Sequence, residues 1–431
     1  MGLIIAFILM GFAVICKYKN GTWVNPSSIF CIEWFIISFL AAIRLYGLYE
    51  ASIKTWMIIF LGSIIYLIGI EFGKKLKINN HLNWYSSINE CGSFMKERTF
   101  WILVLILFIL TLSDFFQTFT FWRAGYNLSE IREASVGMST INSFDRNTGP
   151  LIEWISLAKS IIEILVVANA IECFVFDSKN NKSKIVVALS FELFNSFTTG
   201  GRFSLAYVIL EIISCLMLYR AMLGNYTITI SKKTVRWIRR IAVLMAVAIV
   251  VMTLLRGAEV NELLKKYYRY ICGNVVFMDI HIKDLDSSGF WSCSFAGLYG
   301  FWSKILPIFH GLGFDYPQTY LNTISQVMDT QTFIKIADKM PTNAFITPFY
   351  HIYADFRFFG VIIGMFVFGA FSGCRYATAI KTNNRAQVVF YLITIQMIFK
   401  TLQNYPLTSS IYVFFIIFIL FYNNLLPHKN T

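Results

Sequence analysis

The chain has few charged residues, since Asp, Glu, Lys and Arg make up only 14% of its 431 residues. It also lacks the motifs CxxC, HExxH and GxxxxGK[ST], which hold metal ions or nucleotide phosphates in soluble proteins. The first apolar segment has no basic N-terminal region and no small-residue cleavage site, so we expect it to be retained. These absences argue against a soluble domain and indicate no metal and no nucleotide cofactor.

Apolar residues, by contrast, make up 57% of the chain, and the mean hydropathy is +0.61. Apolar segments of roughly 15–23 residues recur along the whole length, which is the length a helix needs to cross a bilayer. The pattern predicts an all-α polytopic membrane protein with about eleven transmembrane helices. The expected spans are 1–16, 27–49, 55–73, 100–121, 151–176, 185–199, 203–222, 238–255, 357–377, 388–404 and 408–426.

Lys and Arg fall on alternate loops, which sets the expected orientation because basic loops stay in the cytoplasm. The basic groups are Lys17/Lys19, Lys74/Lys75/Lys77, Lys179/Lys182/Lys184, Lys232/Lys233/Arg236/Arg239/Arg240 and Lys381/Arg385. We therefore expect the N-terminus outside and the C-terminus in the cytoplasm. The expected parts are 1–255 with eight spans and the outer loop 122–150, the large extracytoplasmic loop 256–356, and 357–431 with three spans. The net charge of +13 follows from this orientation and requires no nucleic acid.

Ionisable and amide side chains lie inside two neighbouring predicted spans. Lys159 and Glu163 are four residues apart on 151–176, and Glu192 and Asn195 lie on the next, unusually short span. An ionisable group inside a bilayer costs roughly 2.5–3.5 kcal/mol, so it usually faces a partner or a watery cavity. We expect Lys159 and Glu163 to neutralise each other across one helical turn or to mark a functional interior.

The tenth span also carries polar residues at helical spacing, namely Gln396, Lys400, Gln403 and Asn404. On a helix that runs from 388 to 404, these residues share one face. That face is either the wall of a polar cavity or a polar seam between helices.

A glycine turn joins the sixth and seventh spans. The residues Thr198-Thr199-Gly200-Gly201-Arg202 are followed at once by the apolar residues of the next span. Two glycines permit a tight reversal and let a ligand approach the backbone. Arg202 would then stand at the first turn of a helix, whose N-terminal amides also favour anions. The alternative is an ordinary helical hairpin with an interfacial arginine.

Two further arginines are expected on the same side of the membrane. Arg256 lies at the outer end of the eighth span, and Arg132 lies in the outer loop 122–150. Guanidinium groups stay charged and meet phosphate oxygens with two parallel donors, so several of them at one boundary suit a lipid-linked pyrophosphate. Each of them alone is equally consistent with a lipid head-group anchor.

The large outer loop mixes aromatic and charged residues, which is typical of helices that lie on a membrane surface. The segments 263–270 and 290–302 are the clearest examples. Their Tyr and Trp side chains indicate an interfacial belt, with stacking on sugar rings as the alternative. Cys272 and Cys293 share this loop, and the spacing leaves a disulfide between them open. The acidic group around Asp279 is more typical of solvated carboxylates than of a cation site.

The outer loop ends with His351 and Asp355, four residues apart in a segment that continues into the ninth span. On a helix they share a face, where Asp355 can orient or polarise the imidazole. The pair is expected on the same side as Arg202 and Arg256. A histidine at this boundary suits a general base, while the alternative is an inert, outward-facing side chain.

These features together resemble the oligosaccharide repeat-unit polymerases of bacterial surface polysaccharides, the Wzy-type O-antigen and capsule polymerases. The resemblance covers most of the chain. It is carried by the many-span layout, the segment 128–133 with its Ile-Arg, the turn 199–202, the large late outer loop, and the exit from Asn343 to Gly360.

The resemblance implies a GT-C-like architecture and glycosyl transfer at the outer face of the bacterial plasma (inner) membrane. The growing chain on undecaprenyl pyrophosphate would be the donor, and one repeat unit on the same lipid the acceptor, without a nucleotide sugar. A flippase and a chain-length regulator are implied partners. By the same resemblance the pyrophosphate site would comprise Arg202, Arg256, Arg132, Gly200 and Gly201, and the catalytic residues would be His351 and Asp355.

Two alternatives stay open. An O-antigen ligase or another lipid-linked glycosyltransferase would have the same layout and related chemistry. A flippase for lipid-linked oligosaccharides is the alternative from another class, but it would be expected to have short loops and two similar halves. Here the single outer segment 256–356 holds nearly a quarter of the chain.

Overall fold

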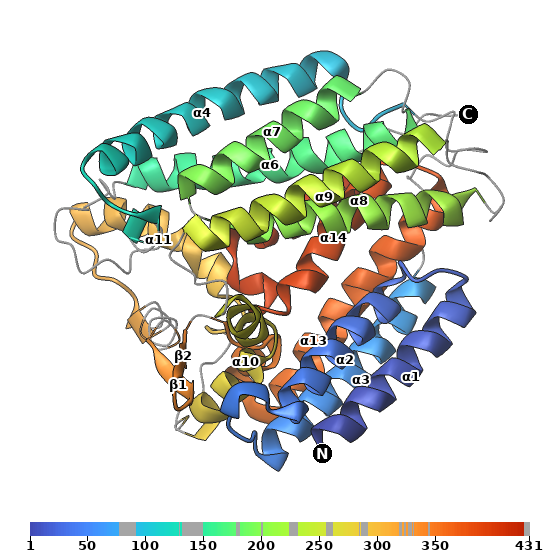
Figure 1. Cartoon of the computed structure of the whole chain (residues 1–431), viewed down its shortest axis with the longest axis vertical. Helices are drawn as coiled ribbons and strands as arrows, with labels where there is room; N and C mark the ends of the chain where they lie inside the picture. The colour runs from blue at the N-terminus through green and yellow to red at the C-terminus, as the bar shows by residue number, and fades with distance from the viewer. Residues whose placement is uncertain are drawn as a thin grey trace. The chain divides into compact units, whose positions relative to one another are not determined.

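The computed structural model describes residues 1–76, 92–128, 130–131, 150–177, 182–199, 201–223, 232–255, 262–283, 285, 292–318, 321–322, 325, 330, 332–343 and 345–425. This part of the chain is mostly helical and contains one two-stranded sheet (Figure 1). The chain divides into two compact units. Unit 1 comprises Met1–Trp84, Leu264–Thr382 and Thr394–Thr431, and unit 2 comprises Tyr85–Leu263 and Asn383–Ile393.

Each predicted span coincides with a helix. Those of unit 1 are α1 (Gly2–Asn20), α2 (Pro26–Ile43), α3 (Ile53–Lys75), α13 (Pro348–Thr382) and α15 (Ser410–Leu425). Those of unit 2 are α4 (Glu97–Arg123), α6 (Pro150–Phe176), α7 (Lys182–Thr199), α8 (Phe203–Met222) and α9 (Lys232–Leu255), and α14 (Arg385–Lys400) belongs partly to each unit. Among the described residues, six helices are long and apolar enough to cross a membrane: α1, α2, α3, α4, α8 and α13. An all-α membrane protein is thus supported, while the count of eleven spans stays a prediction.

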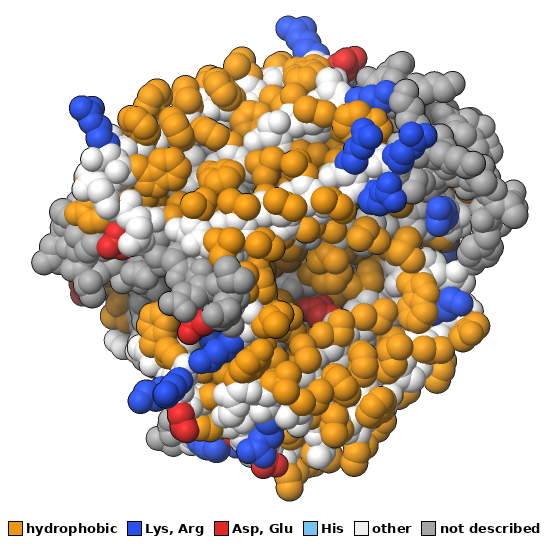
Figure 2. All heavy atoms as spheres, in the orientation of Figure 1, with side chains coloured by type: hydrophobic (Ala, Val, Ile, Leu, Met, Phe, Trp, Pro, Cys, Tyr) orange, Lys and Arg blue, Asp and Glu red, His pale blue; other side chains and the backbone are white. Residues whose placement is uncertain are grey.

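Large apolar side chains are exposed along these helices. Ile4 and Phe7 of α1, Ile53 of α3 and Phe359 of α13 are each more than 60% exposed. Apolar side chains also dominate the face seen in Figure 2. A surface of this kind is a liability in water and is compatible with a lipid environment.

Polar side chains set the beginnings of two helices in unit 1. Asn25 caps α2 by accepting a hydrogen bond from the amide of Ser28, and Ser52 caps α3 in the same way. Asp279 then accepts hydrogen bonds from the amide of Ser52 at 3.0 Å and from the hydroxyl of Thr55 at 2.6 Å. These bonds attach α10 (Leu263–Lys283), which carries Asp279, to the first turn of α3.

Helices α3 and α13 pack backbone against backbone. A Cβ atom at Gly69 or Gly73 of α3, or at Gly369 or Gly373 of α13, would lie closer than 3.0 Å to a carbonyl oxygen of the other helix. Both helices therefore carry a small-xxx-small pattern, which allows the closest approach of helices in membranes. We call this contact the glycine seam.

The predicted outer loop 256–356 contributes helices and a hairpin to unit 1. They are α10, α11 (Ala296–Gly311), and the antiparallel strands β1 (Ile334–Ala337) and β2 (Met340–Thr342). The beginning of α10 is partly exposed, as expected for the segment 263–270, whereas residues 272–279 are buried. Because the run Val275–Met278 is apolar, the second half of α10 joins the core of unit 1.

Helix α13 is interrupted near its beginning. The backbone at Phe356 and Arg357 is not helical, and Arg357 has a φ of 55°, which residues other than glycine rarely adopt. After this point the chain bends so sharply that a Cβ at Gly360 would meet the carbonyl oxygen of Ile352. Residues 348–355 thus form a short helical segment ahead of the long part of α13 in the glycine seam.

Candidate functional site

Arg202 occupies the position that the sequence predicts for it, immediately before the first residue of α8. The turn is held by Thr199, whose hydroxyl donates to the carbonyl of Asn195 and accepts from the amide of Gly201. The guanidinium group donates to the hydroxyl of Thr253 at 2.6 Å. Since Thr253 lies in the last turn of α9, Arg202 reaches the end of that helix within unit 2.

The remaining residues of the predicted pyrophosphate site lie outside the described residues. These are Arg132, Arg256 and Gly200. Arg256 directly follows the last residue of α9, three positions after the threonine that binds Arg202. The contact between Arg202 and Thr253 therefore connects Arg202 to the helical turn that precedes Arg256.

His351 is buried in the short helical segment of unit 1. Its side chain is 7% exposed, and its Nδ1 atom has no hydrogen-bond partner. A buried ring nitrogen without a partner is available to a ligand or to a reacting proton. The geometry is therefore compatible with the predicted role of a general base.

Asp355 does not support the imidazole in the predicted manner. Its carboxylate accepts hydrogen bonds from the amides of Cys293 at 3.0 Å and Ser294 at 2.7 Å, and from the hydroxyl of Ser294. In the described part of the chain no hydrogen bond joins Asp355 to His351. The spacing of four residues puts both on one helical segment, but backbone donors of the turn before α11 bind the carboxylate instead. Asp355 fixes that turn against the segment of His351.

The structure places the predicted site residues in different units. Arg202 belongs to unit 2, and His351 and Asp355 belong to unit 1. Within unit 1, His351 and Asp355 share the segment that precedes the interruption of α13.

The predicted pair of Lys159 and Glu163 is bridged by a third residue. Lys159 donates to Asp114 of α4 at 2.5 Å and to the side-chain oxygen of Asn195 at 3.0 Å. The amide nitrogen of Asn195 donates to Glu163 at 2.6 Å. Glu192, on the same helix as Asn195, is also buried. These polar groups of α4, α6 and α7 bind one another and hold unit 2 together.

Cys272 and Cys293 are both buried, and no disulfide joins them. Burial raises the pKa of each thiol to about 12, and the carboxylate of Asp355 adds to this effect at Cys293. Such thiols are inert at neutral pH. Asp279 binds α3 and Lys283, and no group of metal ligands occurs among the described residues.

Helix α14 ends earlier than the sequence predicts. It stops at Lys400, and the amides of Thr401, Leu402 and Gln403 bond to carbonyls three residues back, which tightens the last turn. Pro406 then begins a short 3-10 helix, Pro406–Thr408, before α15. Gln403 and Asn404 therefore lie in a turn, which we call the α14–α15 turn (residues 401–409).

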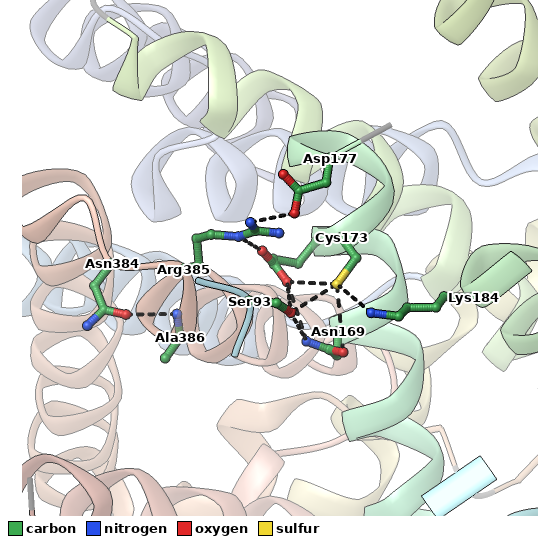
Figure 3. A network of polar contacts seen from close by, with 9 residues as sticks. Ser93, Asn169, Cys173, Asp177, Lys184, Asn384, Arg385 and Ala386 are labelled. Carbon is green, nitrogen blue, oxygen red and sulfur yellow. Dashed lines mark hydrogen bonds and ion pairs between the residues drawn. The ribbon is translucent and has the colours of Figure 1, made fainter. Parts of the chain in front are cut away.

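Three buried polar residues of potential importance escaped sequence reasoning. Glu33 of α2 accepts a hydrogen bond from Thr401, and Asn274 of α10 donates to the carbonyl of Leu402. Glu172 of α6 binds Arg385 within a network that Figure 3 shows. The available signals were Glu33, the one acidic residue of the span 27–49, and Glu172, which has no basic residue three or four positions away on the span 151–176, because a charge in an apolar helix requires a partner.

Comparison of the chain with family models, curated proteins and solved structures finds no match in any of the three.

Proposed function

We propose that this protein polymerises oligosaccharide repeat units linked to undecaprenyl pyrophosphate, at the outer face of the bacterial inner membrane. The product is a surface polysaccharide such as an O-antigen or a capsule. The growing chain is the glycosyl donor, and a single lipid-linked repeat unit is the acceptor. A flippase that delivers the repeat unit and a chain-length regulator are the partners that this activity requires.

The observation that supports the proposal most is the position of Arg202. It stands at the beginning of α8, where free backbone amides favour anions, and its guanidinium reaches the end of α9 just before Arg256. A pyrophosphate group carries several oxygens that accept hydrogen bonds, so two arginines at adjoining helix ends suit it. The many exposed apolar side chains are consistent with a lipid-bound substrate.

The transfer breaks the bond between the anomeric carbon of the donor and the pyrophosphate oxygen. A hydroxyl oxygen of the acceptor forms the new bond to that carbon, and its proton passes to a base. Arg202 and Arg256 stabilise the negative charge that develops on the departing lipid pyrophosphate, with Arg132 as a third candidate. His351 takes the proton at a ring nitrogen, and Asp355 positions the adjoining turn.

The decisive experiment incubates the purified protein with the lipid-pyrophosphate-linked repeat unit, without any nucleotide sugar, and separates the products by size. A ladder of lipid-linked oligomers is the expected result. Unextended substrate would remove the polymerase proposal. Transfer of the glycan to a different lipid acceptor would identify a ligase, and unextended substrate that crosses a vesicle bilayer would identify a flippase.

A further inference from the structure

The α14–α15 turn contacts two parts of the predicted outer loop within unit 1. The amide of Ile346 donates to the carbonyl of Gln403 at 2.8 Å, and the side chain of Asn274 donates to the carbonyl of Leu402 at 2.7 Å. Ile346 lies five residues before His351 in the chain. The turn is therefore built into the same region of unit 1 as the candidate base.

Three amide side chains at this turn each bury one polar atom without a hydrogen-bond partner. The atoms are Oδ1 of Asn274, Nε2 of Gln403 and Oδ1 of Asn404. Beside these amides, Glu33 accepts a hydrogen bond from Thr401 of the turn and buries its other carboxylate oxygen, Oε2, without a partner, which a hydroxyl donor would also satisfy. The side chains of Asn274 and Gln403 are 1% and 6% exposed. A buried polar group without a partner costs about 1–3 kcal/mol, so three of them around one turn require an explanation.

Hydrogen bonds to the other end of two of these amides determine which atom is left without a partner. The ammonium group of Lys400 donates to Oε1 of Gln403 at 2.6 Å, so Nε2 faces away from Lys400. The Nδ2 atom of Asn274 binds the carbonyl of Leu402, so Oδ1 is the free end. The turn thus presents one N–H donor and, with Asn404, two carbonyl oxygens.

This set of atoms selects the chemistry of the ligand. The oxygens of a phosphate group accept hydrogen bonds, so a phosphate could satisfy Gln403 but neither of the two asparagine oxygens. A hydroxyl group both donates and accepts, so hydroxyl groups match the hydrogen-bonding needs of all three residues.

We propose that the α14–α15 turn binds the hydroxyl groups of the acceptor repeat unit, with Asn274, Gln403 and Asn404 as the residues that determine acceptor specificity. The need for a hydroxylated ligand follows from the three unpartnered atoms. Its assignment as the glycosyl acceptor rests on the proposed polymerase function. The pyrophosphate, by contrast, belongs to the arginines of unit 2.

The test measures binding without catalysis. The ligand is the free oligosaccharide, which mild acid releases from the lipid-linked repeat unit of cells that carry the gene for this protein. Its binding is followed through the thermal unfolding temperature of the full-length protein in detergent, measured at increasing oligosaccharide concentrations. Gln403→Glu keeps an oxygen for Lys400 but replaces the free N–H with an acceptor. We expect the half-saturating oligosaccharide concentration to rise at least about tenfold.

Gln318→Glu is the matched control, because Gln318 is an exposed residue of the outer loop and undergoes the same change of charge. Asn404→Leu provides a second variant at a partly exposed position, should Gln403→Glu fail to fold. It removes one of the two free oxygens, and we again expect weaker binding. If the oligosaccharide does not stabilise the wild-type protein, or stabilises both variants as it does the wild type, the turn holds only water.

Polymer formation, assayed separately, distinguishes this inference from the proposed function. Oligosaccharide binding that depends on Gln403, in a protein that makes no polymer, would keep the binding site and remove the polymerase. A polymer ladder together with unchanged binding by Gln403→Glu and Asn404→Leu would keep the polymerase and remove the binding site.

Discussion

In unit 2 charged side chains of different helices form buried ion pairs, whereas at the α14–α15 turn of unit 1 three buried amides each keep one polar atom without a partner. Arg385 binds the buried Glu172 and also Asp177 at 2.6 Å (Figure 3). Lys159 binds Asp114. A buried charge without a partner is far more costly than a buried amide, so the loss of one member of such an ion pair should destabilise the fold strongly. The ion pairs of unit 2 join helices, whereas we propose that the amides at the α14–α15 turn of unit 1 bind a ligand.

The largest expected effect comes from breaking the ion pair between Arg385 and Glu172 in unit 2. Arg385→Leu leaves the carboxylate of Glu172 buried without its partner, and we expect the free energy of unfolding to fall by about 3–5 kcal/mol. The double variant Glu172→Leu/Arg385→Leu removes both charges and should recover most of this loss, because Asp177 is half exposed and stays hydrated. Unfolding in detergent measures the free energy of unfolding of the single and the double variant. Equal stability of Arg385→Leu and the wild type would show that the pair does not hold unit 2 together.

Arg202→Ala tests the arginine within the described part of unit 2 that we assign to the substrate. We expect polymer formation to fall by roughly 10²–10³-fold with little change in thermal unfolding, because the guanidinium serves the leaving pyrophosphate. Arg202→Lys should recover little activity if two parallel N–H donors are needed. Arg220→Ala, at the opposite end of α8, is the control. Full activity of Arg202→Ala would remove the pyrophosphate site from unit 2.

His351→Ala tests the corresponding residue of unit 1. Loss of a general base is expected to slow the transfer by at least about a hundredfold while oligosaccharide binding at the α14–α15 turn persists. His310→Ala is the control, because His310 is an exposed histidine of the same outer segment. Unchanged rates would assign the proton to another group.

Gly73→Leu tests whether unit 1 depends on close backbone contact instead of ion pairs. The new side chain would meet the backbone of Ala370, and we expect the free energy of unfolding to fall by about 1–3 kcal/mol. Gly11→Leu on α1 is the matched control, since a Cβ there would have no neighbour within 4 Å. Equal stability of Gly73→Leu and Gly11→Leu would contradict the stabilising role of the glycine seam.

The smallest expected effect concerns Asp279, an ionised group that unit 1 does bury. Burial tends to raise its pKa, but hydrogen bonds from Ser52 and Thr55 and the ion pair with Lys283 lower the pKa below its ordinary value. A lowered pKa in the folded state means that the stabilising effect is present at neutral pH and is lost as the pH falls below about 4. Asp279→Asn should lose about 1 kcal/mol at pH 7 and little at pH 3. An equal loss of stability at pH 7 and at pH 3 would contradict the stabilising role of the Asp279 charge.

The helices of both units could be predicted from the sequence, and the reason is local. Apolar length located the helix that overlaps each predicted span, because a membrane helix satisfies its own backbone regardless of its neighbours. The end of α14 was misplaced by four residues, since the polar spacing of Lys400 and Asn404 continues past the helix while the backbone does not. Pro406 was the signal that a turn was near.

The partners of the polar residues could not be predicted, because they come from distant parts of the chain. Asp355 and His351 are four residues apart, yet Asp355 binds Ser294, which lies 61 residues earlier. Glu172 and Arg385 are separated by 213 residues. Spacing along a helix indicates which residues share a face, but it does not indicate which element will pack on that face.

The glycine seam also limits how this protein can change over evolutionary time. A clash between two side chains can be relieved by a second substitution that makes room. At Gly69, Gly73, Gly369 and Gly373 the obstacle is a carbonyl oxygen of the opposite helix, which every amino acid has. No substitution of the facing residue removes it. We therefore expect these four positions to stay glycine in related chains, even where the residues that contact the sugar have changed.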